Sequence, residues 1–392
     1  EDIRSILEYH SLGQIWILNA HKNKSEVLAK IFKFSVDTLN IKLEEVPNIK
    51  GKKLFANKYD FEIFEMSRFH GVNLFLKILR LLPPEIAHKI ALDLLSLSYK
   101  FGILSFIFRK PNDENCSFAG MDLSNRLGTA AGLDKNGDYI DCLGALGFGF
   151  LEVGTVTPMP QYGNPKPRVF RNFDDNSIIN RLGFNNRGVD RLVKNLKSRS
   201  FDGIVGVNVG ANKNSNDEER INDYLHCIEK VHKYADYITV NVSSPNTPNL
   251  RNLQNDANLL NLVSKVDKLV NKLQIKIPLF LKISPDENNL TIENIVEIVK
   301  DSIFCGIVAT NTTIDKTALS NIKYKNIEGG LSGEPLMKKS TEMIQLINIK
   351  ANKTIPIIGV GGVMNREDYL EKITSGAGLV QIYTGFVLKG PK

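Results

Sequence analysis

The 392-residue sequence has no apolar run near the ~20 residues needed to cross a bilayer, so we expect no membrane-spanning helix. Its four cysteines lie far apart and form no CxxC pair, and no histidine stands near them at metal-ligand spacing. We therefore expect free, buried thiols, a reducing compartment and no metal site. Lys and Arg give a net charge of +7 but are scattered, without interleaved aromatics, which argues against nucleic acid as a partner.

Short β-branched and apolar runs alternate with helix-like segments from residue 126 onward, a rhythm typical of parallel sheets. A doubly wound sheet more often stops at about five to seven strands, whereas eight strands in ~260 residues match a (β/α)₈ barrel. The sequence therefore predicts an α/β fold, a TIM barrel. The expected strands cover residues 127–131, 150–156, 203–209, 237–243, 279–283, 306–310, 357–360 and 379–383.

Two amphipathic helices are expected before the barrel, over residues 72–82 and 84–101, because proline ends one helix and can begin the next. Residues 66–110 carry seven Lys or Arg against two acids. A basic hairpin too short to span is typical of helices that lie on an anionic membrane surface. The alternative is a helical cap buried on the barrel.

Three regions follow from these patterns. Residues 1–65 form an unassigned N-terminal extension with a possible strand at 14–18 and a helix at 26–38, residues 66–112 form the amphipathic helical subdomain, and residues 113–392 form the barrel.

Polar residues recur where the expected strands end. Because the carboxyl ends of barrel strands converge on one mouth, this recurrence predicts an active site there. The segments concerned are 132–135, 154–155, 208, 241, 282, 310–312, 361–362 and 383–385.

Two Gly-rich turns follow the seventh and eighth strands, at 359–362 and 383–385. In barrels these loops commonly hold phosphate with backbone N–H groups, since glycine lets the main chain approach an anion closely. The alternative is a pair of tight turns. A GxGxxG pattern is absent, which argues against a separate nicotinamide-binding domain.

The segment from Asn241 to Pro248 runs from a strand directly into two prolines and several hydrogen-bonding side chains. Each proline restrains the residue before it, so Ser244 and Thr247 are held in extended geometry. The alternative is a polar turn stiffened by proline. Lys135 and Lys282 also end strands, where they can bind an anion or, as in aldolases, form a Schiff base.

Asparagines at 180, 185, 208, 241, 246 and 311 add neutral donors and acceptors near the same mouth, without a carboxylate pair or a histidine. Hydrolysis and metal chemistry fit such a site poorly. Amides and lysines suit a planar, anionic, amide-bearing ligand, and redox chemistry would need a bound cofactor.

Six motifs carry a resemblance to a known family: AAGLDKNG (130–137), EVGTVTP (152–158), NRLGFNN (180–186), NVSSPNTP (241–248), TNTT (310–313) and GGLSG (329–333). From about residue 72 to the end, their order and spacing resemble dihydroorotate dehydrogenases, and in particular class 2, the membrane-associated class that reduces quinone.

The resemblance implies two sets of binding residues. FMN would be bound by Ala131, Gly132, Leu133, Asp134, Lys135, Thr155, Asn208, Asn241, Lys282, Thr310, Gly333, Gly362, Tyr383 and Thr384. Dihydroorotate would be bound by Lys135, Asn180, Arg181, Leu182, Gly183, Phe184, Asn241, Asn246, Asn311 and Thr312.

The resemblance also implies a mechanism, in which Ser244 takes the position of the catalytic base, where the cytosolic class has cysteine. Ser244 would remove a proton from C5 of dihydroorotate while hydride passes from C6 to flavin N5, giving orotate for pyrimidine (UMP) biosynthesis. A serine hydroxyl is a poor base at neutral pH, so it needs a proton relay, lined in the family by Thr247 and Phe184. Quinone would reoxidise the flavin through a tunnel between the helical subdomain and the barrel.

The family continues past Gly390-Pro391 into a final helix, so we expect a barrel that lacks this helix and is incompletely closed. We expect a monomer, peripheral on the cytoplasmic face of a bacterial inner membrane, with the mitochondrial inner membrane as the alternative. Two other functions compete: an aldolase that uses Lys282, and a membrane-surface binding protein built on a catalytically dead barrel.

Overall fold

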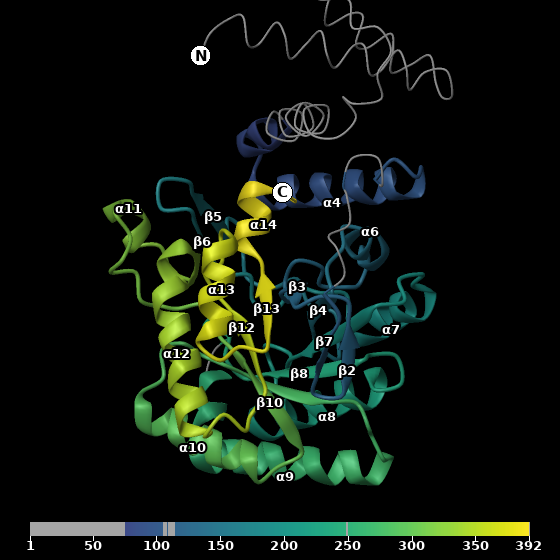
Figure 1. Cartoon of the computed structure of the whole chain (residues 1–392), viewed down its shortest axis with the longest axis vertical. Helices are drawn as coiled ribbons and strands as arrows, with labels where there is room; N and C mark the ends of the chain where they lie inside the picture. Colours follow the sequence, from purple (N-terminus) through teal and green to yellow (C-terminus); the bar gives the residue numbers. More distant parts are fainter. Residues whose placement is uncertain (1–74, 105–107, 109–113, 248–249, 392) are drawn as a thin grey trace, which may run out of the picture. The chain divides into compact units, whose positions relative to one another are not determined.

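The computed structural model describes residues 75–104, 108, 114–247 and 250–391 (Figure 1). The strand and helix expected at 14–18 and 26–38 lie outside these residues. The chain divides into two compact units, residues 1–79 with 392, and residues 80–391. Of the first unit, the structure describes residues 75–79, which are helical.

Eight parallel strands form a closed barrel in the second unit, which confirms the predicted fold. The expected incomplete closure is wrong, because the last strand pairs with both its neighbours, and strand pairing rather than a final helix closes the sheet. In chain order the barrel strands are β3 (Leu127–Thr129), β4 (Phe150–Val156), β7 (Ile204–Val209), β8 (Tyr237–Asn241), β9 (Leu279–Ile283), β10 (Phe304–Ala309), β12 (Ile357–Val360) and β13 (Leu379–Ile382).

Aromatic side chains fill the barrel interior near the amino ends of the strands. The ring of Tyr237 lies 5.6 Å from that of Phe280 and 6.3 Å from that of Phe150, centroid to centroid. Gly206 of the neighbouring strand leaves room for this layer, because a Cβ atom there would lie 2.0 Å from the Tyr237 ring. The barrel is therefore a packed core, and ligands can enter only at its ends.

Helices surround the strands, and several begin at side-chain caps. Asn216, for example, accepts a hydrogen bond from Glu219 N while the Glu219 side chain accepts one from Asn216 N, which forms a capping box. The helices around the barrel are α6 (Ile140–Gly144), α7 (Val189–Ser198), α8 (Asp217–Val231), η3 (Leu250–Gln254), α9 (Asp256–Leu273), α10 (Asn289–Lys300), α11 (Ile322–Lys325), η4 (Glu334–Leu336), α12 (Met337–Lys350), α13 (Arg366–Thr374) and α14 (Thr384–Lys389).

Two small sheets, which we did not expect from the sequence, flank the barrel. The hairpin of β1 (Cys116–Phe118) and β2 (Met121–Leu123) lies at the aromatic layer, where the Phe118 ring stacks on Phe280 with 6.0 Å between centroids. The second sheet pairs β5 (Val169–Asn172), β6 (Ser177–Asn180) and β11 (Gly330–Gly333). The strands of this second sheet are inserted between barrel strands and the helices that follow them. They carry residues toward the carboxyl ends of the barrel strands.

Helix α4 (Pro84–Lys100) precedes the barrel and begins on proline, as expected. It packs against α6 and β5, and Figure 1 shows it crossing beside α6. Glu85 of α4 accepts two hydrogen bonds, of 3.0 and 2.8 Å, from Arg168, the residue before β5.

The outer face of α4 stays exposed. Ile86, Ile90, Leu94 and Leu97 recur at helical spacing and are 51%, 36%, 42% and 49% exposed, while Ala87 is buried. The helix is therefore a cap on the barrel that also keeps an apolar stripe uncovered. Within the described residues, none of the helices combines the length and apolarity that crossing a membrane requires.

The contact of His88 with Leu133 predicts that the stability of the protein depends on pH. His88 Nε2 lies 2.8 Å from the carbonyl oxygen of Leu133, which suits a neutral imidazole that donates. Burial, reinforced by the positive charge of Lys135, lowers the pKa of His88 to about 4. Because the unfolded chain takes up this proton near pH 6.5 and the folded protein does so only near pH 4, stability falls as pH drops through this window.

We expect His88→Gln, whose amide keeps a donor for Leu133, to lose less stability than the wild type between pH 6.5 and pH 4.5. Thermal unfolding at several pH values measures this difference. Equal losses in both proteins would show that protonation of His88 does not oppose folding.

Candidate functional site

Asn241, the last residue of β8, lies at the centre of a buried hydrogen-bond network at the carboxyl end of the barrel. Its Nδ2 donates to Thr155 Oγ1 and Asn208 Oδ1, both at 3.1 Å, and Thr155 Oγ1 donates to Asn208 Oδ1 at 2.6 Å. Asn311 Nδ2 donates to Asn241 Oδ1 at 3.3 Å. The network joins β4, β7, β8 and the segment after β10, so it orients these amides before any ligand binds.

Ser244 follows β8 and lines a cavity at this end of the barrel, with only 5% of its surface exposed. Asn246 N donates to Ser244 Oγ at 3.2 Å. Pro245 restricts the backbone of Ser244 to extended geometry. The site therefore holds a buried hydroxyl whose backbone has little freedom.

Two lysines add positive charge to the same cavity. Lys135 Nζ donates to Gly132 O at 3.0 Å, and burial lowers the pKa of Lys135 to about 8 while the Glu85 carboxylate opposes this shift. Lys282 is 5% exposed, and burial lowers its pKa against the raising effect of Glu152. Each ammonium would be favoured by a bound anion, because an opposite charge restores the charged form.

The Gly-rich turn after β12 lies along another wall of the cavity. Gly361 and Gly362 adopt φ of +124° and +82°, which side-chain-bearing residues rarely take. A Cβ atom on Gly362 would lie 2.3 Å from Met337 Cα, at the start of α12. The turn therefore brings main chain, rather than side chains, against the cavity and the N-terminal end of a helix, an arrangement that suits phosphate.

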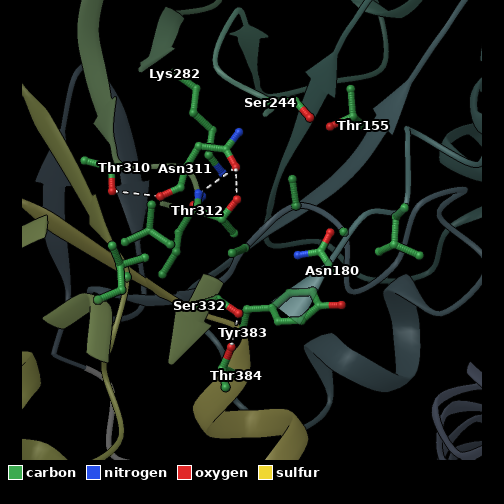
Figure 2. A pocket seen from close by; sticks show the side chains of 18 of the residues that line it. Thr155, Asn180, Ser244, Lys282, Thr310, Asn311, Thr312, Ser332, Tyr383 and Thr384 are labelled. Carbon is green, nitrogen blue, oxygen red and sulfur yellow. Dashed lines mark hydrogen bonds between the residues drawn. The ribbon is translucent and has the colours of Figure 1, made fainter. Parts of the chain in front are cut away.

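The cavity opens at the carboxyl ends of the barrel strands and is lined by residues from several of them. Figure 2 shows side chains from different strand ends arranged around it, among them Ser244, Lys282, Asn311 and Tyr383. The site residues expected from sequence that line it are Ala131, Gly132, Lys135, Thr155, Asn180, Leu182, Gly183, Phe184, Asn241, Ser244, Asn246, Lys282, Thr310, Asn311, Thr312, Gly333, Gly362, Tyr383 and Thr384.

Arg181 and Leu133 were also expected in the site but are not among the lining residues. Arg181 Nη2 donates to Pro167 O at 3.0 Å, and its guanidinium lies over the Phe170 ring, 5.4 Å from the centroid. The carbonyl oxygen of Leu133 is the partner of His88 on α4. Both residues therefore make contacts outside the cavity.

Asp134, Asn208 and Thr247 were expected in the site but are not among the residues that line the cavity. Asp134 accepts hydrogen bonds from three backbone N–H groups of the turn that follows it, and burial raises its pKa to about 6. Asn208 belongs to the Asn241 network, and its Nδ2 donates to Glu152 Oε1 at 2.8 Å. Thr247 is buried, at 4% exposed. Asp134 and Asn208 thus support the cavity wall from behind.

Glu152 is the principal residue that the sequence analysis left without a role. It is 1% exposed inside the barrel, and its Oε2 accepts hydrogen bonds from Tyr237, Thr239 and Gln381 at 3.0, 3.0 and 2.7 Å. An acid within an otherwise apolar strand was the signal for this cluster. Glu152 itself does not line the cavity. The lining residues that were absent from the expected FMN, substrate and catalytic sets are Ala130, Ser332, Leu336, Val360, Gly361, Val363, Gln381 and Ile382.

Comparison with known proteins places these features in a family. The model of the family described as dihydroorotate dehydrogenase matches residues 115–392. The chain is 47% identical to the dihydroorotate dehydrogenase (quinone) of Buchnera aphidicola over 320 residues, which cover 80% of this chain and 95% of that protein. It is 46% identical to the protein of the same name from Neisseria meningitidis serogroup B, covering 80% of this chain and 95% of that one.

A solved structure is similar as well. The ligand-free DHODH of Eimeria tenella superimposes with a TM-score of 0.72 at 32% identity, covering 79% of this chain and 91% of that one. The family model matches more than two thirds of the sequence. The barrel fold and the site motifs at its mouth are consistent with this match. The chain belongs to the dihydroorotate dehydrogenase family.

Proposed function

We propose that this chain oxidises dihydroorotate to orotate for pyrimidine nucleotide synthesis and delivers the electrons to a membrane quinone. The observation that carries the proposal is the placement of Ser244, a buried hydroxyl in a cavity that also contains Lys135 and Lys282. Curated relatives at 44–47% identity carry quinone in their names, which supports the choice of acceptor.

The cavity suits FMN as the cofactor. Gln381 lines it, and Gln381 Oε1 is buried without a hydrogen-bond partner among the described residues, so an N–H group of a bound ring system would satisfy it. The turn at Gly361 and Gly362 suits the phosphate. We assign FMN binding to the lining members of the set expected from sequence, with Asp134 and Asn208 in support. When bound, FMN accepts the hydride that the substrate loses.

The substrate end of the cavity suits an anionic, amide-bearing ring. The Lys135 ammonium would pair with the substrate carboxylate, and the amides of Asn180, Asn246 and Asn311 would bind the ring amide groups. Ser244 Oγ would then remove the proton from C5. Because the asparagines are held by bonds such as Asn246 Nδ2 to Asn180 Oδ1, at 3.3 Å, little reorganisation is needed on binding.

The proton must leave Ser244, because a serine hydroxyl is a poor base at neutral pH. Phe184 lines the cavity, and the buried Thr247 lies three residues beyond Ser244 in the chain. We assign to these two residues the lining of the relay. Lys282 would hold positive charge beside the bound ring system and so stabilise negative charge that develops there.

A direct experiment tests the reaction. Purified protein should show flavin absorbance that bleaches when dihydroorotate is added without oxygen. Quinone, fumarate and a nicotinamide cofactor are then added in parallel, and quinone should restore the absorbance fastest. Absence of flavin, or flavin that dihydroorotate leaves unchanged, would overturn the proposal, and faster reoxidation by fumarate or nicotinamide would overturn the choice of acceptor.

We also propose that residues 66–112 dock the protein, as a monomer, on an anionic membrane surface where quinone is found. The exposed stripe of Ile86, Ile90, Leu94 and Leu97 on α4 supports this, because an apolar helix face within a basic segment binds at the headgroup boundary. The basic charge belongs to residues 66–110 as a whole, which carry seven Lys or Arg against two acids.

Replacing both Leu94 and Leu97 by glutamate should weaken binding to vesicles of phosphatidylcholine and phosphatidylglycerol by about tenfold or more. Flotation of the protein with the vesicles measures it, and flavin bleaching by dihydroorotate should be unchanged. The matched control replaces Leu260 and Leu290, which are 53% and 68% exposed on other helices. Equal vesicle binding by both double variants would exclude α4 as the docking surface.

A further inference from the structure

Lys372 of α13 is a fully buried lysine that the proposed reaction does not use, and its exposed fraction is 0%. Its Nζ donates to Ser340 Oγ at 2.7 Å and to Thr341 Oγ1 at 2.8 Å, and lies 3.5 Å from Met337 O. All three acceptors are neutral and belong to the first turns of α12. The buried cation is thus hydrogen-bonded but not neutralised by these partners.

Within the part of the chain that the structure describes, no carboxylate forms an ion pair with Lys372. Burial lowers the pKa of Lys372 to about 7, against the weaker opposing effects of Glu371 and Asp368. A buried charge without a counter-charge is costly, so the Lys372 ammonium gives up its proton more readily than an exposed lysine, and a nearby anion would favour the charged form again.

The contacts of Lys372 lead to the cavity. Ser340 Oγ, which accepts the hydrogen bond from Lys372, lies 2.9 Å from the carbonyl oxygen of Gly361. Gly361 and Gly362 line the cavity, and Met337, at the start of α12, packs directly against Gly362. The side chain of Ser340 therefore connects the Lys372 ammonium to the Gly-rich turn.

Two sources of positive potential meet behind this turn. The N-terminal end of α12 carries a partial positive charge from the helix dipole, and the protonated Lys372 ammonium adds its charge beside it. These two repel each other, so the arrangement is unfavourable unless an anion binds on the other side of the turn. The cavity is the space that lies there.

We propose that Lys372 is the buried counter-charge for the cofactor phosphate and positions the Gly361–Gly362 turn, so that the protein selects FMN over riboflavin. This rests on the proposed function, because it takes FMN as the ligand. Lys372 acts through Ser340 and the turn, as a positioning residue rather than a catalytic one.

The test compares two ligands that differ only in the phosphate. Apoprotein is titrated with FMN and with riboflavin, following flavin fluorescence, for the wild type, Lys372→Gln and Lys372→Met. Lys338→Met is the matched control, since Lys338 lies on α12 with its side chain 88% exposed. We expect both Lys372 variants to bind FMN about tenfold or more weakly while riboflavin binding hardly changes, and the control to match the wild type.

Two other outcomes would overturn the proposal, and a third would contradict the proposed function. Equal weakening of both ligands would assign Lys372 a structural role in the fold and overturn the proposal. Lys372→Gln keeps N–H donors for Ser340 and Thr341 without the charge, so wild-type FMN affinity in this variant would also overturn it, and it still decides the matter if Lys372→Met does not fold. Failure of wild-type protein to bind either flavin would instead contradict the proposed function.

Discussion

Replacing Ser244 by alanine is expected to slow the reduction of bound flavin by dihydroorotate about 10²- to 10⁴-fold, the usual contribution of a general base. The flavin content of the protein should stay unchanged. Ser244 is buried at the end of β8, and the hydroxyl is the group that the substitution removes from the cavity. Anaerobic stopped-flow mixing with dihydroorotate measures the rate of bleaching.

Two further variants make the result for Ser244 specific. Ser244→Cys restores an ionisable group, so its rate should exceed that of alanine and rise with pH as the thiol ionises. Ser198→Ala removes a hydroxyl from the exposed end of α7 and should reduce flavin at the wild-type rate. If Ser244→Ala bleaches as fast as the wild type, another group takes the proton, and the role assigned to Ser244 is wrong.

Replacing Glu152 by alanine is expected to lower the free energy of unfolding by about 3–5 kcal/mol, as when one member of a buried charged cluster is lost. The substitution leaves Tyr237, Thr239 and Gln381 without their acceptor in the barrel interior. It also removes the negative charge that favours the ammonium of Lys282. Urea denaturation of the flavin-free protein measures the loss.

The comparison variants for Glu152 separate charge from packing. Glu152→Gln keeps an acceptor but not the charge, so its loss of stability should be smaller than that of alanine. Glu342→Ala, on the exposed side of α12, should change the free energy of unfolding by less than about 0.5 kcal/mol. Equal stability of Glu152→Ala and Glu342→Ala would show that the barrel interior does not depend on this cluster.

The sequence by itself determined the barrel and most of its strands. A strand such as β12 is buried along its whole length, so it appears in the sequence as a continuous apolar run bounded by turn residues. Helix α4 was predictable for a similar reason, because proline and the spacing of its apolar residues are local signals. The motifs at the strand ends also predicted most of the residues that line the cavity.

Other features depend on segments that are far apart in the chain. The hydrogen bond between Glu152 and Gln381 joins residues separated by 229 positions, and it exists only because the barrel closes. The sheet of β5, β6 and β11 pairs Asn180 with Gly330, which brings Asn180 and Ser332 to the cavity. Periodicity reports which face of a segment is buried, but not what it is buried against.

The direction of individual side chains was likewise decided by the tertiary structure. Arg181 lies within a site motif, yet its guanidinium rests over Phe170, while Lys372, in no motif at all, lies behind the Gly-rich turn. A motif specifies residue types at a strand end, whereas the neighbours that a side chain contacts come from other strands. The sequence thus determined the barrel and the chemistry at its mouth, and only packing decided which charges were buried together.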